Sequence, residues 1–231
     1  MNFKHIILIR FNYPKNEANL DIRKRYLEEI CLHSLERQTN KNFSVLICSN
    51  LDLTFNSELD IFIVGDGNNH GKWKMDSTNR NKKLKELSEN YEYIITTRLD
   101  SDDVLLPNCI DIIQKNFQEK DKIIIDPSGY TYESRVNKFM EYTSSRPSQF
   151  LSLIESTINP VYCYKKPHTN MKQLGPVITL DDLVRIYVVH DLSIFSSKKS
   201  SSRYNGKVVE IPKNCKYYIE KWNELLKEIK K

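Results

Sequence analysis

The sequence predicts an α/β fold, in which a mainly parallel central sheet is flanked by helices and followed by a C-terminal amphipathic helix. Three observations lead to this prediction. Apolar runs that are too continuous for a surface edge alternate with segments whose apolar residues have helical spacing. This alternation of strands and helices is typical of layered α/β proteins. Polar clusters also follow three of the predicted strands, and ligands bind such sheets at the carboxyl ends of the strands.

The first half of the chain contains the clearest elements. The segment "HIILIRF", residues 5–11, has consecutive aliphatic residues and predicts the first buried strand. A helix is predicted at "DIRKRYLEEICLHSLERQ", and two strands follow it, at "FSVLICSN" and "LDIFIVGDG". A second helix, "TNRNKKLKELSEN", leads to the fourth strand at residues 91–97.

The second half has less regular patterns. A helix is predicted from Pro107 onward, and a strand, "KIIIDPSG", is expected to stop at Pro127 and Gly129. We then expect a short helix over residues 151–155 and a strand at "VRIYVV". The closing segment predicts an amphipathic helix that packs on the body of the protein through one apolar stripe, formed by Tyr218, Trp222, Leu225, Leu226 and Ile229.

Size and composition exclude several classes of protein. The 231 residues are enough for one large domain, and 39% hydrophobic and 28% charged residues fit a globular protein. No apolar run could span a membrane and no secretory signal is recognisable, so we expect a cytoplasmic protein. Five scattered cysteines without a CxxC pair predict buried, reduced thiols. The net charge of +5 is spread along the chain, which disfavours nucleic acid as a partner.

The segment "YEYIITTRLDSDDVLLP" places three carboxylates directly behind a predicted strand. Asp100, Asp102 and Asp103 would repel one another unless a positive group lies among them. Mg²⁺ and Mn²⁺ take carboxylate oxygens together with phosphate oxygens, so Asp100 and Asp102 could hold a cation that bridges to a diphosphate. The alternative is a solvated acidic turn before the helix near Pro107, with Asp103 close to the helix N-terminus.

The segment "TTRLDSDDVL" resembles the metal-binding segment of GT-A glycosyltransferases, and more narrowly that of the "putative rhamnosyltransferase" family of bacteria and large algal viruses. Four further blocks resemble the family in the same order, from residue 6 to about 197: "ILIRFN", "CLHSLERQTNKNFSVLI", "SQFLSLIES" and "YVVHDLS". The chain departs from the family around its late histidine. A Trp-bearing strand is replaced by residues 185–187, and an Asn is replaced by Ser193, so sugar and acceptor specificity stay open.

The resemblance implies one GT-A domain over residues 1–231, with a Rossmann-like sheet and a bound Mn²⁺ or Mg²⁺ ion. Its nucleotide-binding part would cover about 1–128, its acceptor side about 129–200 and its terminal helix about 215–231. The resemblance also implies that Asp102 carries the metal, that Asp100 lies near the ribose or the metal, and that His190 completes the metal shell. A packed or surface histidine is the alternative for His190.

Residues at the other predicted strand ends are candidates for binding the sugar donor. The resemblance implies that Arg10 and Asn12 contact the nucleobase and ribose, and that Asp66 contacts the nucleobase. Arg80 and Arg98 could reach phosphate or uracil, and Arg98 could instead pair with the neighbouring acids. For each of these basic residues a surface salt bridge is the alternative.

An inverting transfer needs a base that removes the proton from the acceptor hydroxyl. Glu155 is the first candidate, because it follows an apolar stretch whose burial would raise its pKa. Asp182, next to Asp181, is the second candidate. The alternative for these two acids is the start of a helix after Thr179.

We therefore expect a metal-dependent hexosyltransferase, narrowed by the resemblance to a rhamnosyl- or glucosyltransferase. It would move the sugar from a UDP- or dTDP-sugar to a glycan acceptor. Two other functions stay open. A metal-dependent phosphoryl-transfer enzyme could use the same acids, although it would usually need a second metal site. A non-catalytic nucleotide-sugar-binding module could also keep this scaffold.

Overall fold

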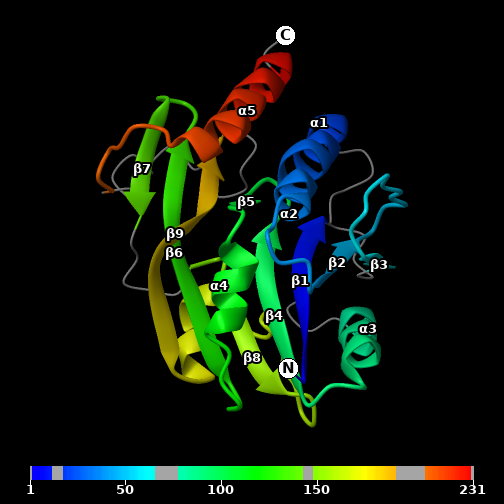
Figure 1. Cartoon of the computed structure of the whole chain (residues 1–231). Coiled ribbons are helices and arrows are strands. Elements are labelled where there is room, and N and C mark those ends of the chain that lie inside the picture. The colour runs from blue at the N-terminus through cyan, green and yellow to red at the C-terminus, as the bar shows by residue number, and fades with distance from the viewer. Residues whose placement is uncertain (1, 12–17, 66–77, 143–147, 191–205, 230–231) are drawn as a thin grey trace.

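The structure is a computed structural model that describes residues 2–11, 18–65, 78–142, 148–190 and 206–229. Its strands form one nine-stranded sheet in the order β3-β2-β1-β4-β8-β6-β9-β5, with β7 paired to β6. Helices pack on both faces of this curled sheet (Figure 1). The fold is therefore α/β, as the sequence predicts.

Four parallel strands form the half of the sheet that ends in the polar clusters. They are β1 (Phe3–Phe11), β2 (Ser44–Ser49), β3 (Ile61–Gly65) and β4 (Tyr93–Asp100). β1 pairs with β2 on one side and with β4 on the other, and β3 continues the order beyond β2. β1, β2 and β4 are buried on both faces, which explains their continuous apolar runs. Their carboxyl ends meet at the upper edge of the sheet in Figure 1.

The other half of the sheet is mixed in direction. It contains β5 (Val104–Leu105), β6 (Ile123–Glu133), β7 (Lys138–Tyr142), β8 (Ser152–Ser156) and β9 (Val177–Val189). β6 and β9 run parallel, whereas β8 is antiparallel to both β4 and β6. Because β8 is antiparallel to both β4 and β6, strands β6 and β9 run in the same direction as β1 to β4. The sheet is therefore mainly parallel, as predicted, and β5, β7 and β8 are the strands that run against their neighbours.

Two predictions for this half are wrong. The segment predicted as a helix over residues 151–155 belongs largely to strand β8, which lies between β4 and β6. A short apolar run fits a strand or a helix equally well, and here the neighbouring strands decide. β6 also does not stop at Pro127 and Gly129. Two register shifts against β9 flank Ser128 and let the strand continue to Glu133.

A long helical segment follows β1 and covers one face of the sheet. It consists of α1 (Leu20–Arg25), the π-helical turn η1 (Tyr26–Leu32) and α2 (His33–Glu36). α4 (Cys109–Lys115) packs on the same apolar core, and α3 (Thr78–Ser88) covers the opposite face. The described residues also include two short 3₁₀ helices, η2 (His168–Gln173) and η4 (Lys213–Cys215).

The terminal helix α5 (Lys216–Ile229) forms as predicted. Tyr218, Trp222 and Leu225 of its apolar stripe are buried, and Leu226 packs against the same cluster. This cluster joins α5 to η1, β5, β6 and β9, so α5 is held by the body of the protein. The side chain of Ile229 lies outside the described residues.

All five cysteine thiols are buried and unpaired, as the sequence predicts. Among the described residues, no helix combines the length and the apolar character that crossing a membrane would require.

Candidate functional site

The acidic loop, residues 100–103, is a tight turn at the carboxyl edge of the parallel strands. β4 delivers Asp100 to this edge, and the amide of Asp103 donates a hydrogen bond to the Asp100 carbonyl oxygen at 3.1 Å. β5 begins at Val104 and pairs with β9. Each of the three acids in this turn has a different partner, so the loop is more ordered than a solvated acidic turn.

Asp100 faces Arg10 at the end of β1. The two residues are register partners, and the Arg10 Nη2 to Asp100 Oδ1 distance is 3.5 Å. Burial raises the pKa of Asp100, the charge of Arg10 opposes this rise, and the charge of Asp102 adds to it. Arg10 is therefore one positive group that offsets the repulsion among the acids.

Asp102 faces His190, which follows β9. His190 Nε2 lies 2.9 Å from Asp102 Oδ2, and the imidazole is fully buried. Burial raises the pKa of Asp102, but the hydrogen bond and charge of His190, with a smaller contribution from Arg23, hold that pKa below its ordinary value. The structure thus joins two residues that are 88 positions apart in the sequence.

Asp103 points into the protein instead. It is fully buried, and its Oδ1 accepts a hydrogen bond from the Val188 amide at 3.0 Å. Burial, together with the charges of Asp102 and Asp100, raises the pKa of Asp103 well above its ordinary value. Asp103 therefore ties the acidic loop to β9 rather than facing a ligand.

Two buried arginines lie on the opposite face from the long helical segment. The Arg98 guanidinium donates hydrogen bonds to the Cys163 and Lys166 carbonyl oxygens and lies 4.6 Å from the centre of the Tyr164 ring. Arg80 of α3 lies 5.7 Å from the same ring. The pairing of Arg98 with the neighbouring acids does not occur among the described contacts, because its guanidinium holds the segment after Tyr162.

The donor atoms of Asp102 and His190 suit a small divalent cation. Neighbouring ligands at about 2.1 Å from an octahedral ion are about 3 Å apart, close to the observed Asp102–His190 separation. Carboxylate and imidazole are both acceptable to Mn²⁺, and binding would displace the proton between them. Within the described part of the chain, however, no three His, Cys, Asp or Glu side chains meet in one metal-binding group. Further ligands would have to come from water or from phosphate oxygens.

Asn12 and Asp66 lie outside the described residues, although both follow strands that end at this edge. Their predicted contacts with the nucleobase and ribose stay predictions.

Glu155 lies at the other end of the sheet. It opposes Ile94 near the start of β4, six residues before Asp100, which corresponds to about 20 Å along the strand. Its carboxylate accepts hydrogen bonds from the amides of Val161 at 2.9 Å and Tyr162 at 2.7 Å. Burial raises the pKa of Glu155 to about 7. The raised pKa fits the prediction from sequence, but the structure does not bring Glu155 together with the acidic loop.

Asp182 is separated from His190 by most of β9. It is exposed and lies in β9, within the two-residue irregularity where Leu180 and Leu183 oppose Pro127 and Ser128. The expected alternative, a helix start after Thr179, is therefore wrong. Asp182 precedes His190 by eight residues, about 25 Å along an extended strand.

Sequence reasoning missed two aromatic residues beside the Asp102–His190 pair. The Tyr26 ring of η1 lies 5.1 Å from the His190 ring, and Trp222 Nε1 donates a hydrogen bond to the Asp102 carbonyl oxygen at 3.1 Å. Both residues occupy apolar helical positions, which signal burial but not proximity to a site.

A family model described as "Putative rhamnosyl transferase" matches residues 4–193. A search of curated proteins gave no match. Residues 1–349 of S. aureus TarS, crystallised with UDP-GlcNAc, share 14% identity with a TM-score of 0.52, covering 81% of this chain and 59% of that one. A longer S. aureus TarS structure shares 14% identity with a TM-score of 0.50, covering 80% of this chain and 37% of that one.

At this identity the likeness to TarS shows the fold alone, which is of the GT-A type, as predicted. The chain spans less than two thirds of either TarS chain.

Proposed function

The chain belongs to the family described as "Putative rhamnosyl transferase", and on that basis we propose that it transfers a sugar from a nucleoside-diphosphate sugar to a glycan acceptor. We further propose that Mn²⁺ or Mg²⁺ bridges the protein to the diphosphate. The observation that carries this proposal is the Asp102–His190 pair, which lies beside the Arg10–Asp100 pair at the carboxyl edge of the parallel strands.

The proposed cation would be held by Asp102 and His190, with Asp100 next to them in the acidic loop. When bound, such a cation neutralises the charge that develops on a departing diphosphate. The side chains of Arg10 and Asp100 are each about one third exposed, at 30% and 31%, so Arg10 can meet an anion. A guanidinium binds phosphate oxygens through paired N–H donors.

Arg80 and Arg98 would act differently from Arg10. Both are buried and lie against the Tyr164 ring, and the Arg98 guanidinium is already hydrogen-bonded to backbone carbonyl oxygens. We propose that they add positive potential beneath the diphosphate and fix the segment around Tyr164. Burial raises the pKa of Tyr164, and the charge of Asp100 adds to this rise.

A uridine donor is favoured by the UDP-GlcNAc that accompanies the TarS structure of the same fold. The family description favours rhamnose as the sugar. Inversion at the anomeric carbon remains part of the proposal. Glu155 and Asp182 are not proposed as the base, since Glu155 lies about 20 Å along the strands from Asp100 and Asp182 lies about 25 Å along β9 from His190.

Thermal unfolding with a panel of nucleotides tests this function. UDP, dTDP and GDP, and the corresponding sugars, are added with and without Mn²⁺. We expect one nucleotide to raise the melting temperature of the protein, and to do so only when Mn²⁺ is present. We also expect the protein to hydrolyse the sugar derivative of that nucleotide slowly. Stabilisation without hydrolysis or transfer would favour a binding module. Phosphatase activity without nucleotide stabilisation would favour a phosphoryl-transfer enzyme.

A further inference from the structure

Helix α5 lies outside the region that matches the family model, yet it contacts the acidic loop. The family match ends at residue 193, and α5 begins at Lys216. From this helix the Trp222 indole Nε1 donates a hydrogen bond of 3.1 Å to the carbonyl oxygen of Asp102. A chain segment beyond the family match therefore reaches the proposed metal ligand directly.

The position of the Trp222 indole is fixed by packing. The side chain is fully buried, and its ring stacks on Tyr132 of β6 with centroids 6.0 Å apart and planes inclined by 23°. The Tyr132 hydroxyl in turn donates a hydrogen bond of 2.7 Å to Asn223 Oδ1 in the same helix. An indole held in this way can donate in only one direction, and that direction is towards Asp102.

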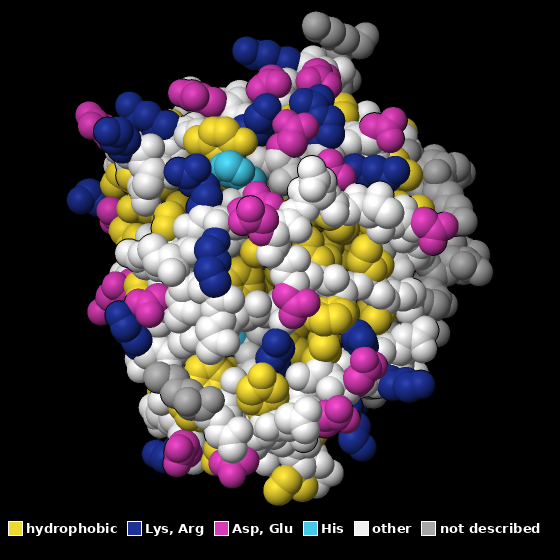
Figure 2. Space-filling view, turned by 45° about the vertical axis from the view of Figure 1, so that its right-hand side comes forward, with side chains coloured by type: hydrophobic (Ala, Val, Ile, Leu, Met, Phe, Trp, Pro, Cys, Tyr) yellow, Lys and Arg dark blue, Asp and Glu magenta, His cyan; other side chains and the backbone are white. Residues whose placement is uncertain are grey.

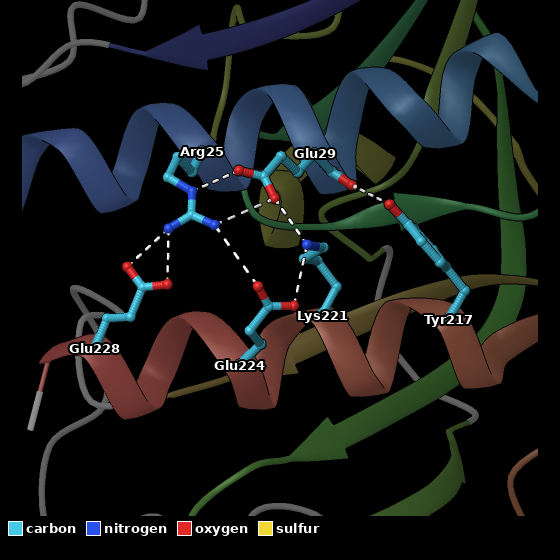
Figure 3. Close-up of polar contacts among 6 residues, drawn as sticks. All are labelled: Arg25, Glu29, Tyr217, Lys221, Glu224 and Glu228. Carbon is cyan, nitrogen blue, oxygen red and sulfur yellow. Dashed lines mark hydrogen bonds and ion pairs between the residues drawn. The ribbon is translucent and has the colours of Figure 1, made fainter.

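The same helix also supports the partner of Asp102. Tyr26, which covers the His190 ring, belongs to η1, and η1 packs along α5. A network of ion pairs joins α5 to η1 and to the end of α1 (Figure 3). Arg25 contacts both Glu29 and Glu228, and Lys221 contacts both Glu29 and Glu224.

We propose that Trp222 is a positioning residue that holds Asp102 in the orientation in which its carboxylate meets His190. The proposal rests on the proposed function, in which this pair holds the cation. The acidic loop is a four-residue turn, so each anchor to its backbone limits where the carboxylates can point. Groups that orient a metal ligand without touching the metal typically change metal affinity by about 10- to 100-fold when they are removed.

Trp222→Phe tests the role of the indole N–H, because phenylalanine keeps an aromatic ring but cannot donate a hydrogen bond. Leu225→Ala is the matched control. It truncates a fully buried side chain of the same helix and core cluster, and it leaves the Trp222 donor in place.

Hydrogen–deuterium exchange of the metal-free protein is the first measurement. We expect the amides of Asp103 and Val188, which form the hydrogen bonds of the acidic loop, to exchange about fivefold faster in Trp222→Phe. In Leu225→Ala these amides should change no more than the other amides of β5 and β9. Equal loss of protection in both variants would show that Trp222 only contributes to the core, and would overturn the proposal.

The Mn²⁺ concentration needed for half-maximal UDP binding is the second measurement. We expect it to rise about tenfold in Trp222→Phe and less than twofold in Leu225→Ala at a temperature where both are folded. An unchanged Mn²⁺ requirement in Trp222→Phe would contradict the proposal. If the wild-type protein shows no Mn²⁺-dependent UDP binding, the proposed function fails, and the exchange comparison alone decides whether Trp222 positions the loop.

Discussion

Asp102 is held at two points. Its carbonyl oxygen accepts a hydrogen bond from Trp222 and its carboxylate is paired with His190. A ligand group that is already oriented loses less conformational freedom when a metal or substrate binds. The neighbouring acids have other partners, Arg10 for Asp100 and the Val188 amide for Asp103.

Asp102→Asn is expected to abolish Mn²⁺-dependent stabilisation by nucleotide and to lower turnover by about 100-fold or more, because the amide removes the anionic metal ligand. The measurements are melting temperature with UDP and Mn²⁺, and transfer or donor hydrolysis. Asp182→Asn is the control, since Asp182 is exposed and lies about 25 Å along β9 from His190. Loss of activity in Asp182→Asn with normal activity in Asp102→Asn would reverse the assignment of the site.

Helix α5 is joined to α1 and η1 by charges as well as by its apolar stripe. Five charged side chains form a connected network, and Tyr217 adds a hydrogen bond from its hydroxyl to the Glu29 carbonyl oxygen (Figure 3). In the space-filling view, basic and acidic side chains gather together at the end of the molecule where α1 and α5 lie (Figure 2). The network is partly exposed, so solvent and salt weaken it.

Arg25→Gln is expected to lower the free energy of unfolding by about 1 kcal/mol at low salt, because Arg25 pairs with three glutamates. The loss should shrink in 1 M NaCl, where charges are screened over about 3 Å. Urea unfolding at both salt concentrations measures this. Lys115→Gln, which breaks a single helical pair with Asp111, is the control and should cost less than about 0.5 kcal/mol. A salt-independent loss for Arg25→Gln would indicate packing by its side-chain stem.

Pairing of β6 with β9 depends on the absence of a side chain at Gly129. A methyl group there would lie 2.3 Å from Arg185 Cγ and 2.4 Å from the Arg185 carbonyl oxygen. Gly129→Ala should therefore lower the free energy of unfolding by about 2–3 kcal/mol, because backbone atoms would have to move. Gly65→Ala is the control, since a methyl group there meets nothing within 4 Å. Equal stability of the two variants, measured by chemical unfolding, would contradict this packing.

At the scale of the whole molecule, Glu155 links strand β8 to the segment that runs towards the candidate site. Its carboxylate binds two backbone amides, while Thr96 and Arg98 of β4 hold the Cys163 amide and carbonyl groups. These contacts follow one face of β4 from its start towards Asp100. Glu155 therefore has a structural role in the arrangement described.

The pKa of Glu155 makes stability depend on pH. Burial raises this pKa from 4.5 to about 7, so the folded protein keeps the proton over a range in which the unfolded chain has lost it. The stabilising contribution of the proton is complete below pH 4.5 and is lost as the pH rises to about 7. The total loss is on the order of 3 kcal/mol.

Glu155→Gln should remove this dependence. We expect the stability of the wild-type protein, relative to the Gln variant, to fall as the pH rises from about 4.5 to about 7, as measured by urea unfolding at each pH. Parallel profiles for the two proteins would contradict the raised pKa. Because Glu155 lies far from the acidic loop, the variant should also retain near-normal transfer activity where it is folded. Loss of transfer without loss of stability would restore Glu155 as a candidate base.

Several elements have a pattern that is strong and local enough to be predicted without a structure. The continuous apolar runs of β1, β2 and β4, the amphipathic stripe of α5 and the acids behind β4 were all predictable from their spacing. The family resemblance added His190. The helix predicted for residues 151–155 is wrong, because five residues are too few to distinguish the helical period from the strand period. The segment becomes a strand because β4 and β6 flank it.

Which residues meet depends on how distant elements pack against one another. The antiparallel course of β8 carries Glu155 to the start of β4, away from Asp100, and no local pattern encodes that direction. Trp222 and Asp102 are 120 residues apart, and their contact depends on how α5 docks against β5, β6 and η1. Periodicity fixes the face of a helix that becomes buried, whereas the partner of each buried side chain follows from the packing of distant elements.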